Sequence, residues 1–176
     1  MKNSCLFLDR DGVINQDLKY LCDPKKIMLI DGIKELIQKV NEKKHWKVIV
    51  VTNQSGIARG YYTEDDFHYF MEKLKDILYP AYWDDYYFCP FHPDGTIKKY
   101  KKNSLLRKPN PGMIIKALSD HNIDLDSSII VGDKSSDLEA GFSSGLKRGY
   151  ILGNNQIEFE TEYEFKRIKN LTEIVI

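Results

Sequence analysis

The sequence predicts an α/β fold in which helices cover both faces of a central parallel sheet. Short apolar runs of strand length occur at residues 5–8, 46–51, 86–89, 128–131 and 149–152. Apolar residues at helical spacing, or helix-cap residues, mark the stretches between them, at residues 32–43, 63–80, 111–118 and 135–144. This alternation is typical of strand–helix–strand units, whose consecutive strands are parallel.

The first three elements have the plainest signals. Residues 5–8 form a continuous apolar run, which ends at a charged turn containing Gly12. Apolar side chains recur at helical spacing in residues 32–43, and residues 46–51 form a second apolar run. We therefore expect a buried strand, a long connection, a helix and a second strand, in that order.

The middle of the chain predicts a helix, a strand and another helix. Thr63 is a good N-cap residue, with Asp66 three residues later, for a helix that ends at Pro80. Residues 86–89 follow as a short strand. Pro111 then opens the next helix, because its fixed φ suits the first helical position.

The last third of the chain repeats the pattern and adds a tail. Residues 128–131 and 149–152 are apolar strands on either side of a helix expected at residues 135–144. The acidic, aromatic tail ends in the apolar residues 174–176. We expect this end to be an edge strand or a docked segment.

Two long connections interrupt the alternation, at residues 16–30 and 91–108. The second contains Pro93, Gly95 and a lysine cluster, with few residues suited to a core. Both exceed the usual length of links in α/β units, and long loops at sheet ends are often functional. We interpret them as loop insertions in a single domain that spans residues 1–176.

The charge balance excludes partners that need a strong overall field. The chain has 26 basic and 26 acidic residues, so neither nucleic acid nor an anionic membrane surface is an expected partner. There is no apolar run of bilayer length, and residues 1–4 lead into a short strand rather than a signal peptide. Three cysteines without paired spacing disfavour a disulfide framework. From these observations we expect a cytoplasmic protein. We also expect a monomer, since no amphipathic stretch is left over after the helices are assigned.

Polar side chains gather where the predicted strands end, and an open parallel sheet binds its ligands at this edge. The residues are Asp9 and Asp11 after the first strand, Thr52, Asn53, Gln54 and Ser55 after the second, Arg107 and Lys108 before the Pro111 helix, and Asp133, Lys134 and Asp137 after the fourth. Together they supply carboxylates, a hydroxyl, amides and cations. This is the inventory for Mg²⁺ and a phosphoryl group.

Each group also has a plain structural explanation. Asp9 and Asp11 suit a solvated turn, residues 52–56 suit a polar loop or helix cap, and residues 107–108 suit a solvated charge pair. Asp137 suits a helix N-terminus. Only their joint occurrence on consecutive strand ends favours a reaction centre.

In this order the motifs resemble those of the haloacid dehalogenase (HAD) superfamily of phosphohydrolases. The matching residues are Asp9-Arg10-Asp11-Gly12, Thr52, Lys108 and Gly132-Asp133 with Asp137. More narrowly, FLDRDGVIN, VVTNQSGIARG, RKPNPGM and VGDKSSDLEAG resemble the heptose 1,7-bisphosphate phosphatases and the related histidinol phosphatase branch. The resemblance implies a HAD-like Rossmannoid three-layer sandwich without a large cap domain.

The resemblance also implies roles for these residues. Asp9 would be the nucleophile that forms an aspartyl phosphate, and Asp11 the proton donor and acceptor. Mg²⁺ would bind Asp9, the backbone carbonyl of Asp11 and Asp133. Phosphoryl oxygens would be held by Thr52, the Asn53 amide and Lys108. Lys134 and Asp137 would support the metal shell, and by strand alternation we expect Arg10 to point away from both acids.

The expected substrate contacts lie mainly in the loop of residues 16–30, called the early loop below, and after the second strand. They are Asp17, Tyr20, Asn53, Gln54, Ser55, Arg107 and Lys134. Relatives often carry a His-Gly-Tyr run where this chain reads Asp17-Leu18-Lys19-Tyr20, so we expect its sugar contacts to differ. Arg107 resembles the family's substrate-recognition residue and suits a bidentate hold on phosphate.

Zinc is the clearest departure from the family. Relatives commonly have Cys-x-His before the long loop and Cys-x-Cys before Arg-Lys-Pro. This chain keeps Cys89, has His92 one residue late, and reads Ser104-Leu105-Leu106 in place of the second pair. Two ligands cannot close a tetrahedral site, so we expect no Zn²⁺. Residues 91–103 should then pack through other contacts or move more.

The resemblance implies an Mg²⁺-dependent phosphatase that removes the 7-phosphate of D-glycero-D-manno-heptose 1,7-bisphosphate in the biosynthesis of nucleotide-activated heptose. Histidinol phosphate or another small sugar phosphate is the alternative substrate. A non-catalytic binding protein on the same fold is less favoured, because the catalytic set is intact. The sequence leaves open the α or β anomer and the ADP- or GDP-heptose route.

Overall fold

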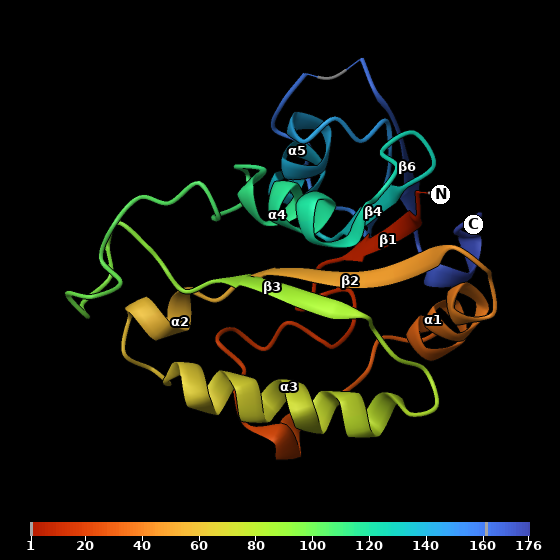
Figure 1. Ribbon diagram of the computed structural model, residues 1–176. Helices are drawn as coiled ribbons and strands as arrows, with labels where there is room; N and C mark the ends of the chain where they lie inside the picture. The colour runs from red at the N-terminus through yellow and green to blue at the C-terminus, as the bar shows by residue number, and fades with distance from the viewer. Residues whose placement is uncertain (1, 161) are drawn as a thin grey trace.

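A six-stranded, fully parallel sheet forms the centre of the computed structural model, which describes residues 2–160 and 162–176 (Figure 1). Its strand order is β3-β2-β1-β4-β5-β6. The strands are β1 (Ser4–Leu8), β2 (Trp46–Asn53), β3 (Asp85–Cys89), β4 (Ile129–Gly132), β5 (Arg148–Leu152) and β6 (Glu164–Ile168). The parallel α/β fold predicted from the sequence is confirmed.

Helices cover both faces of this sheet, which gives three layers (Figure 1). On one face lie α1 (Ile33–Asn41) and α3 (Glu64–Leu78), and on the other α4 (Gly112–His121) and α5 (Ser135–Ser143). Side chains alternate along β1 and so face two separate parts of the core. Leu6 and Leu8 belong to the first hydrophobic cluster, which packs against α1 and α3, whereas Cys5 and Phe7 belong to the second, which packs against α4 and α5. Among the described residues there is no helix long and apolar enough to cross a membrane.

The predicted start of α3 is confirmed in atomic detail. The Thr63 hydroxyl accepts a hydrogen bond from the Asp66 backbone N–H (3.1 Å), and the Asp66 carboxylate accepts one from the Thr63 backbone N–H (2.8 Å). This reciprocal capping box satisfies two backbone donors that a helix N-terminus leaves free. The buried face of α3 then consists of Phe67, Phe70, Met71, Leu74 and Leu78.

The C-terminal tail differs from one of its two predicted forms. The edge strand is β6, not residues 174–176, which lie outside the described strands. Four of the five β6 residues are exposed, so this charged edge strand has no apolar run to reveal it. Ile174 is buried in the first cluster, and Lys43 Nζ donates to the Ile176 carbonyl (2.9 Å), so the alternative of a docked segment is correct.

The long loop after β3 packs against α2 (Ser55–Ala58) and the start of α3. The Ala58 carbonyl accepts hydrogen bonds from the backbone N–H groups of Thr96 (2.8 Å) and Ile97 (2.9 Å). The Tyr100 hydroxyl donates to Glu64. These contacts join the loop to α2 and α3, in line with the expectation that it packs through contacts of its own side chains and backbone.

Candidate active site

The sheet places the candidate site at its topological switch point. Chain connections run to opposite sides of the sheet from the adjacent central strands β1 and β4, and this arrangement opens a crevice at their carboxyl ends. Asp9 follows β1, and Asp133 follows β4. The intervening turn needs Gly12, whose φ is +89° and whose added Cβ would lie 2.4 Å from Asp133 Oδ2. The Asp9–Gly12 turn therefore fits closely against Asp133.

Three carboxylates form an acidic cluster at this point. Asp9, Asp133 and Asp137 each offer an oxygen within 4.8 Å of the others. Burial and the nearby Asp9 charge raise the pKa of Asp133 to about 7, and burial raises the pKa of Asp9 although Lys108 opposes that shift. Asp133 Oδ1 is also buried without a hydrogen-bond partner. A hard divalent cation would relieve both conditions, so the donor set fits Mg²⁺.

Lys108 is the buried cation of the cluster. Its Nζ lies 2.8 Å from Asp9 Oδ1 and 2.6 Å from Asp137 Oδ1, and it donates to the Val51 carbonyl (2.7 Å). Burial alone would lower the pKa of Lys108, but Asp137 and Asp9 outweigh it and raise the pKa. The ammonium group therefore stays charged between the two carboxylates.

Asn53 fixes the segment that carries Lys108. Its side-chain amide donates to the Lys108 carbonyl and its Oδ1 accepts from the Lys108 backbone N–H, both at 3.0 Å. This pair of hydrogen bonds joins the end of β2 to the loop before α4. The Asn53 side chain thus positions Lys108, while the residue also lines the cavity described below.

Arg10 corrects the prediction made from strand alternation. It is fully buried, and its guanidinium binds Asp11 through Nε to Oδ1 (3.0 Å) and Nη2 to Oδ2 (2.5 Å). The guanidinium also lies 4.6 Å from the Phe70 ring centroid. Alternation does not apply here because β1 ends at Leu8 and the chain then turns.

The remaining predicted contacts meet in one cavity of about 750 Å³. The predicted residues that line it are Asp11, Asp17, Tyr20, Asn53, Gln54, Ser55, Arg107, Lys108 and Lys134. Thr52 is buried and does not line the cavity itself. It is linked to the lining residue Gln54, whose Nε2 donates a hydrogen bond to the Thr52 hydroxyl (2.8 Å). Lys134 Nζ contacts Asp17 Oδ2 (2.9 Å), so the early loop closes onto the end of β4.

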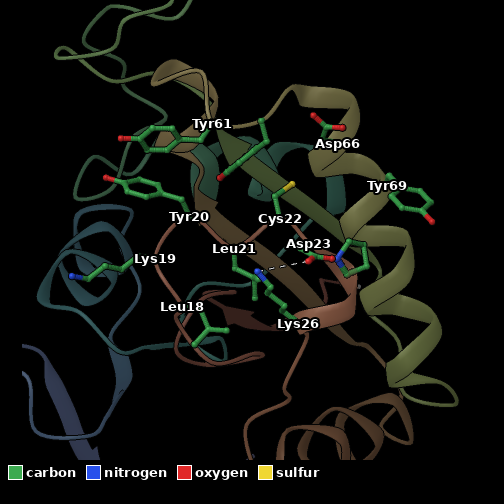
Figure 2. A pocket seen from close by; sticks show the side chains of 12 residues that line it. Leu18, Lys19, Tyr20, Leu21, Cys22, Asp23, Lys26, Tyr61, Asp66 and Tyr69 are labelled. Atoms are coloured by element: carbon green, nitrogen blue, oxygen red, sulfur yellow. Dashed lines mark ion pairs between the residues drawn. The ribbon is translucent and has the colours of Figure 1, made fainter.

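A second cavity of about 720 Å³ adjoins the first and shares Lys19, Tyr20 and Tyr62 with it. Figure 2 shows it between the early loop and α3, with Tyr20 and Tyr61 side by side at one end. Their ring centroids are 4.8 Å apart in an edge-to-face arrangement. Aromatic rings therefore form the outer wall of the candidate site.

Sequence patterns did not reveal Asn15 and Tyr62, which complete the polar network around Asp11 and Gln54. Asn15 Nδ2 donates to Asp11 Oδ1 (3.1 Å), and the Tyr62 hydroxyl donates to Gln54 Oε1 (2.6 Å). Asn15 ends the string FLDRDGVIN, but the motif alone assigned it no role, and Tyr62 lies outside the quoted motifs. For Arg10 a signal did exist, because a basic residue between two acids at the end of a buried strand needs a partner.

A Rossmann-like sheet with paired acids after its first strand, and a buried lysine between acids, defines a phosphoryl-transfer enzyme of the α/β class. A family model described as HAD-hydrolase-like matches residues 105–158. The D-glycero-α-D-manno-heptose-1,7-bisphosphate 7-phosphatase of Burkholderia mallei is 49% identical over 148 residues, which cover 83% of this chain and 78% of that protein. The corresponding β-anomer 7-phosphatase of Helicobacter pylori is 37% identical, covering 98% and 95%.

A solved structure gives the same result. The crystal structure of D,D-heptose 1,7-bisphosphate phosphatase from B. bronchiseptica, complexed with magnesium and phosphate, aligns with a TM-score of 0.82 at 26% identity, covering 96% of this chain and 94% of that one. The chain belongs to the HAD-like phosphatases, in the same family as these relatives. The resemblance inferred from its motifs is confirmed.

Proposed function

We propose that this phosphatase removes the 7-phosphate of D-glycero-D-manno-heptose 1,7-bisphosphate, for the synthesis of nucleotide-activated heptose. The observation that carries the proposal is the acidic cluster, in which Lys108 Nζ lies 2.8 Å from Asp9 and Asp133 has a buried oxygen without a partner. The names of the Burkholderia mallei and Helicobacter pylori relatives supply the substrate class.

In the proposed reaction, an Asp9 oxygen attacks phosphorus in line and the bond from phosphorus to the sugar oxygen breaks. Asp11 gives a proton to that leaving oxygen, and then takes a proton from the water that hydrolyses the aspartyl phosphate. Asp9, Asp133 and the Asp11 backbone carbonyl would hold Mg²⁺, whose charge would offset repulsion between carboxylate and phosphate. Inorganic phosphate leaves, and both carboxyl groups return to their initial states.

Phosphoryl oxygens need donors where negative charge accumulates. We assign this role to the Thr52 hydroxyl, the Asn53 backbone amide and Lys108, with Lys134 and Asp137 supporting the metal shell. The proposal for Lys108 is supported by its burial and its contact with the nucleophile.

The rest of the substrate would lie in the cavity of about 750 Å³. Its proposed contacts are Asp17, Tyr20, Ser55, Arg107 and Lys134, with the Gln54 amide, also predicted as a contact, buried behind them. For Arg107 the support is a buried Nη1 without a hydrogen-bond partner among the described residues. Such a guanidinium is suited to a second phosphate group.

A phosphate-release assay tests the substrate directly. We expect one or both anomers of heptose 1,7-bisphosphate to be hydrolysed with a kcat/KM well above that of histidinol phosphate, and only with Mg²⁺ present. A preference for histidinol phosphate, or equal rates after chelation, would contradict the proposal. The expectations of a single domain, a cytoplasmic monomer and no structural zinc stay predictions, and metal analysis of the purified protein tests the last.

A further inference from the structure

One buried amide links a tyrosine outside the predicted site to two residues inside it. The Tyr62 hydroxyl donates to Gln54 Oε1 (2.6 Å), and Gln54 Nε2 donates to Asp11 Oδ2 (3.2 Å) and Thr52 Oγ1 (2.8 Å). Gln54 is only 1% exposed, so water does not compete for these groups. All three hydrogen bonds of the amide are made within the protein.

The partners fix which way the amide points. Burial raises the pKa of the Tyr62 hydroxyl, so it keeps its proton and donates to the amide oxygen. An amide turned by 180° would instead place Oε1 against the Asp11 carboxylate. The Gln54 N–H groups therefore face Asp11 and Thr52 because Tyr62 holds the oxygen on the other side.

This orientation of the amide decides which hydrogen bonds Thr52 and Asp11 accept and which they remain able to donate. Thr52 Oγ1 accepts from Gln54, so its own proton is free to be donated to a phosphoryl oxygen. As a carboxylate, Asp11 accepts from Gln54, from Asn15 and from Nε and Nη2 of Arg10, so four N–H groups hold it in one position. A disordered Gln54 would disturb the donor and the proton carrier together.

Local packing supports this arrangement. A Cβ at Gly56 would lie 2.3 Å from Tyr62 Cε1, so the absence of a side chain at Gly56 lets the tyrosine ring approach the start of α2. Tyr62 lines both cavities, and its hydroxyl bonds the Gln54 amide. The missing side chain at Gly56 therefore leaves the space that the Tyr62 ring fills.

We propose that Tyr62 is a positioning residue for catalysis, which acts through Gln54 to orient Asp11 and Thr52. The inference rests on the proposed phosphatase reaction but concerns kcat rather than substrate choice. Tyr62 itself touches neither the reacting phosphoryl group nor the metal in this scheme.

Tyr62→Phe removes the hydroxyl and keeps the ring. We expect kcat to fall by about 5- to 10-fold, the effect of one lost hydrogen bond, while KM changes less than about twofold. The matched control is Tyr79→Phe, because Tyr79 is 77% exposed, follows the far end of α3, and its hydroxyl makes no hydrogen bond with the described residues. Its kcat should stay within about twofold of the parent.

A double-mutant cycle separates positioning from general loss of structure. We call the hydrogen bonds from Tyr62 through Gln54 to Asp11 and Thr52 the relay. Gln54→Met already breaks it, so adding Tyr62→Phe in that background should change kcat by less than about twofold. Gln54→Glu, which turns the donor toward Asp11 into an acceptor, should lower kcat by at least about 100-fold. This second variant tests the relay even where Tyr62→Phe folds poorly.

The outcomes distinguish this inference from the proposed function. If the parent releases phosphate but Tyr62→Phe retains its kcat, or loses as much in the Gln54→Met background as alone, the relay is wrong and the phosphatase function stands. If the parent releases no phosphate from any phosphomonoester, the proposed function itself fails.

Discussion

At the scale of single residues, Lys108 is the cation that offsets the negative charge of the buried carboxylates in the site. It is 4% exposed and contacts both Asp9 and Asp137, which are themselves buried. Removing one partner of a buried ionic group leaves the others uncompensated, which costs far more than the group contributes net. The same ammonium is proposed to stabilise the transferring phosphoryl group.

Lys108→Met should therefore damage stability and activity together. We expect the free energy of unfolding to fall by about 3–5 kcal/mol and kcat to fall at least about 1,000-fold. Urea denaturation and phosphate release measure the two effects. The control is Lys116→Met, which removes an exposed lysine of an i,i+4 pair and should cost less than about 1 kcal/mol. Equal stability of the two variants would contradict the proposed role.

Asp133 makes the metal-free protein sensitive to pH. Burial and the Asp9 charge raise the pKa of Asp133 from 3.8 to about 7 in the folded state. The folded protein therefore binds this proton more tightly than the unfolded chain, so the stabilisation is present below the unfolded pKa and lost as pH rises through 7.

The Tm of the chelated protein should fall between pH 5 and pH 8, by about 3 °C or more, the shift that ~1 kcal/mol produces at this chain length. Adding Mg²⁺ at pH 8 should raise it again. Asp133→Asn should weaken both effects, whereas Asp65→Asn on the exposed start of α3 should not. A Tm of the chelated parent that rises over this pH interval would show that the sign is wrong.

Arg10 marks the limit of sequence reasoning at this scale. The acids beside it were found because they follow an apolar strand, but its direction was inferred from a strand period that ends two residues earlier, at Leu8. The turn instead directs the guanidinium onto Asp11 and the Phe70 ring. The Asn15–Asp11 and Tyr62–Gln54 hydrogen bonds join residues four and eight positions apart, but they depend on the directions of the turns between them, which no periodic pattern gives.

At the scale of elements, the loop of residues 91–103 is held by hydrogen bonds to α2 and to the start of α3. The backbone N–H groups of Thr96 and Ile97 bind the Ala58 carbonyl, and Tyr100 binds Glu64 at the start of α3. Lys102 also lies 4.0 Å from the Phe91 ring centroid. The sequence predicted that this loop packs through other contacts or moves more, but not which residues make the contacts.

Tyr100→Phe should loosen this loop without unfolding the sheet. The lost hydrogen bond contributes about 1 kcal/mol, so amide hydrogen exchange around residue 97 should become roughly 5-fold faster while β1 and β4 keep their protection. Hydrogen exchange measured by mass spectrometry resolves the two regions. Tyr82→Phe, a change at a half-exposed ring away from the loop, is the control. Unchanged exchange in the loop would show that Tyr100 does not hold it.

Element prediction succeeded where burial is strongest. The central strands β1, β2 and β4 are nearly wholly buried and read as apolar runs, and the α3 cap is a local signal of two residues. The edge strand β6 is largely exposed and charged, and α2 has four residues, too few to show a period. Exposed or very short elements take their form from neighbours, and this explains both omissions.

At the scale of the whole molecule, the strand order brings residues distant in sequence to one edge of the sheet. Asp9, Thr52 and Asp133 come from the ends of parallel strands, and Lys108 comes from the loop before α4, which Asn53 joins to the end of β2. That is why the sequence predicted the site's composition and location. It did not predict the hydrogen bonds among these side chains, because they depend on the exact directions of the turns.

The central claim is that Asp9 is the nucleophile of an Mg²⁺-dependent phosphatase. Asp9→Asn keeps the shape of the side chain and its neighbours but removes the attacking charge. We predict that this variant retains the fold by circular dichroism and loses at least about 1,000-fold in phosphate release from heptose 1,7-bisphosphate, while Asp65→Asn stays within about twofold. Phosphate release by Asp9→Asn at the parent rate would contradict the account.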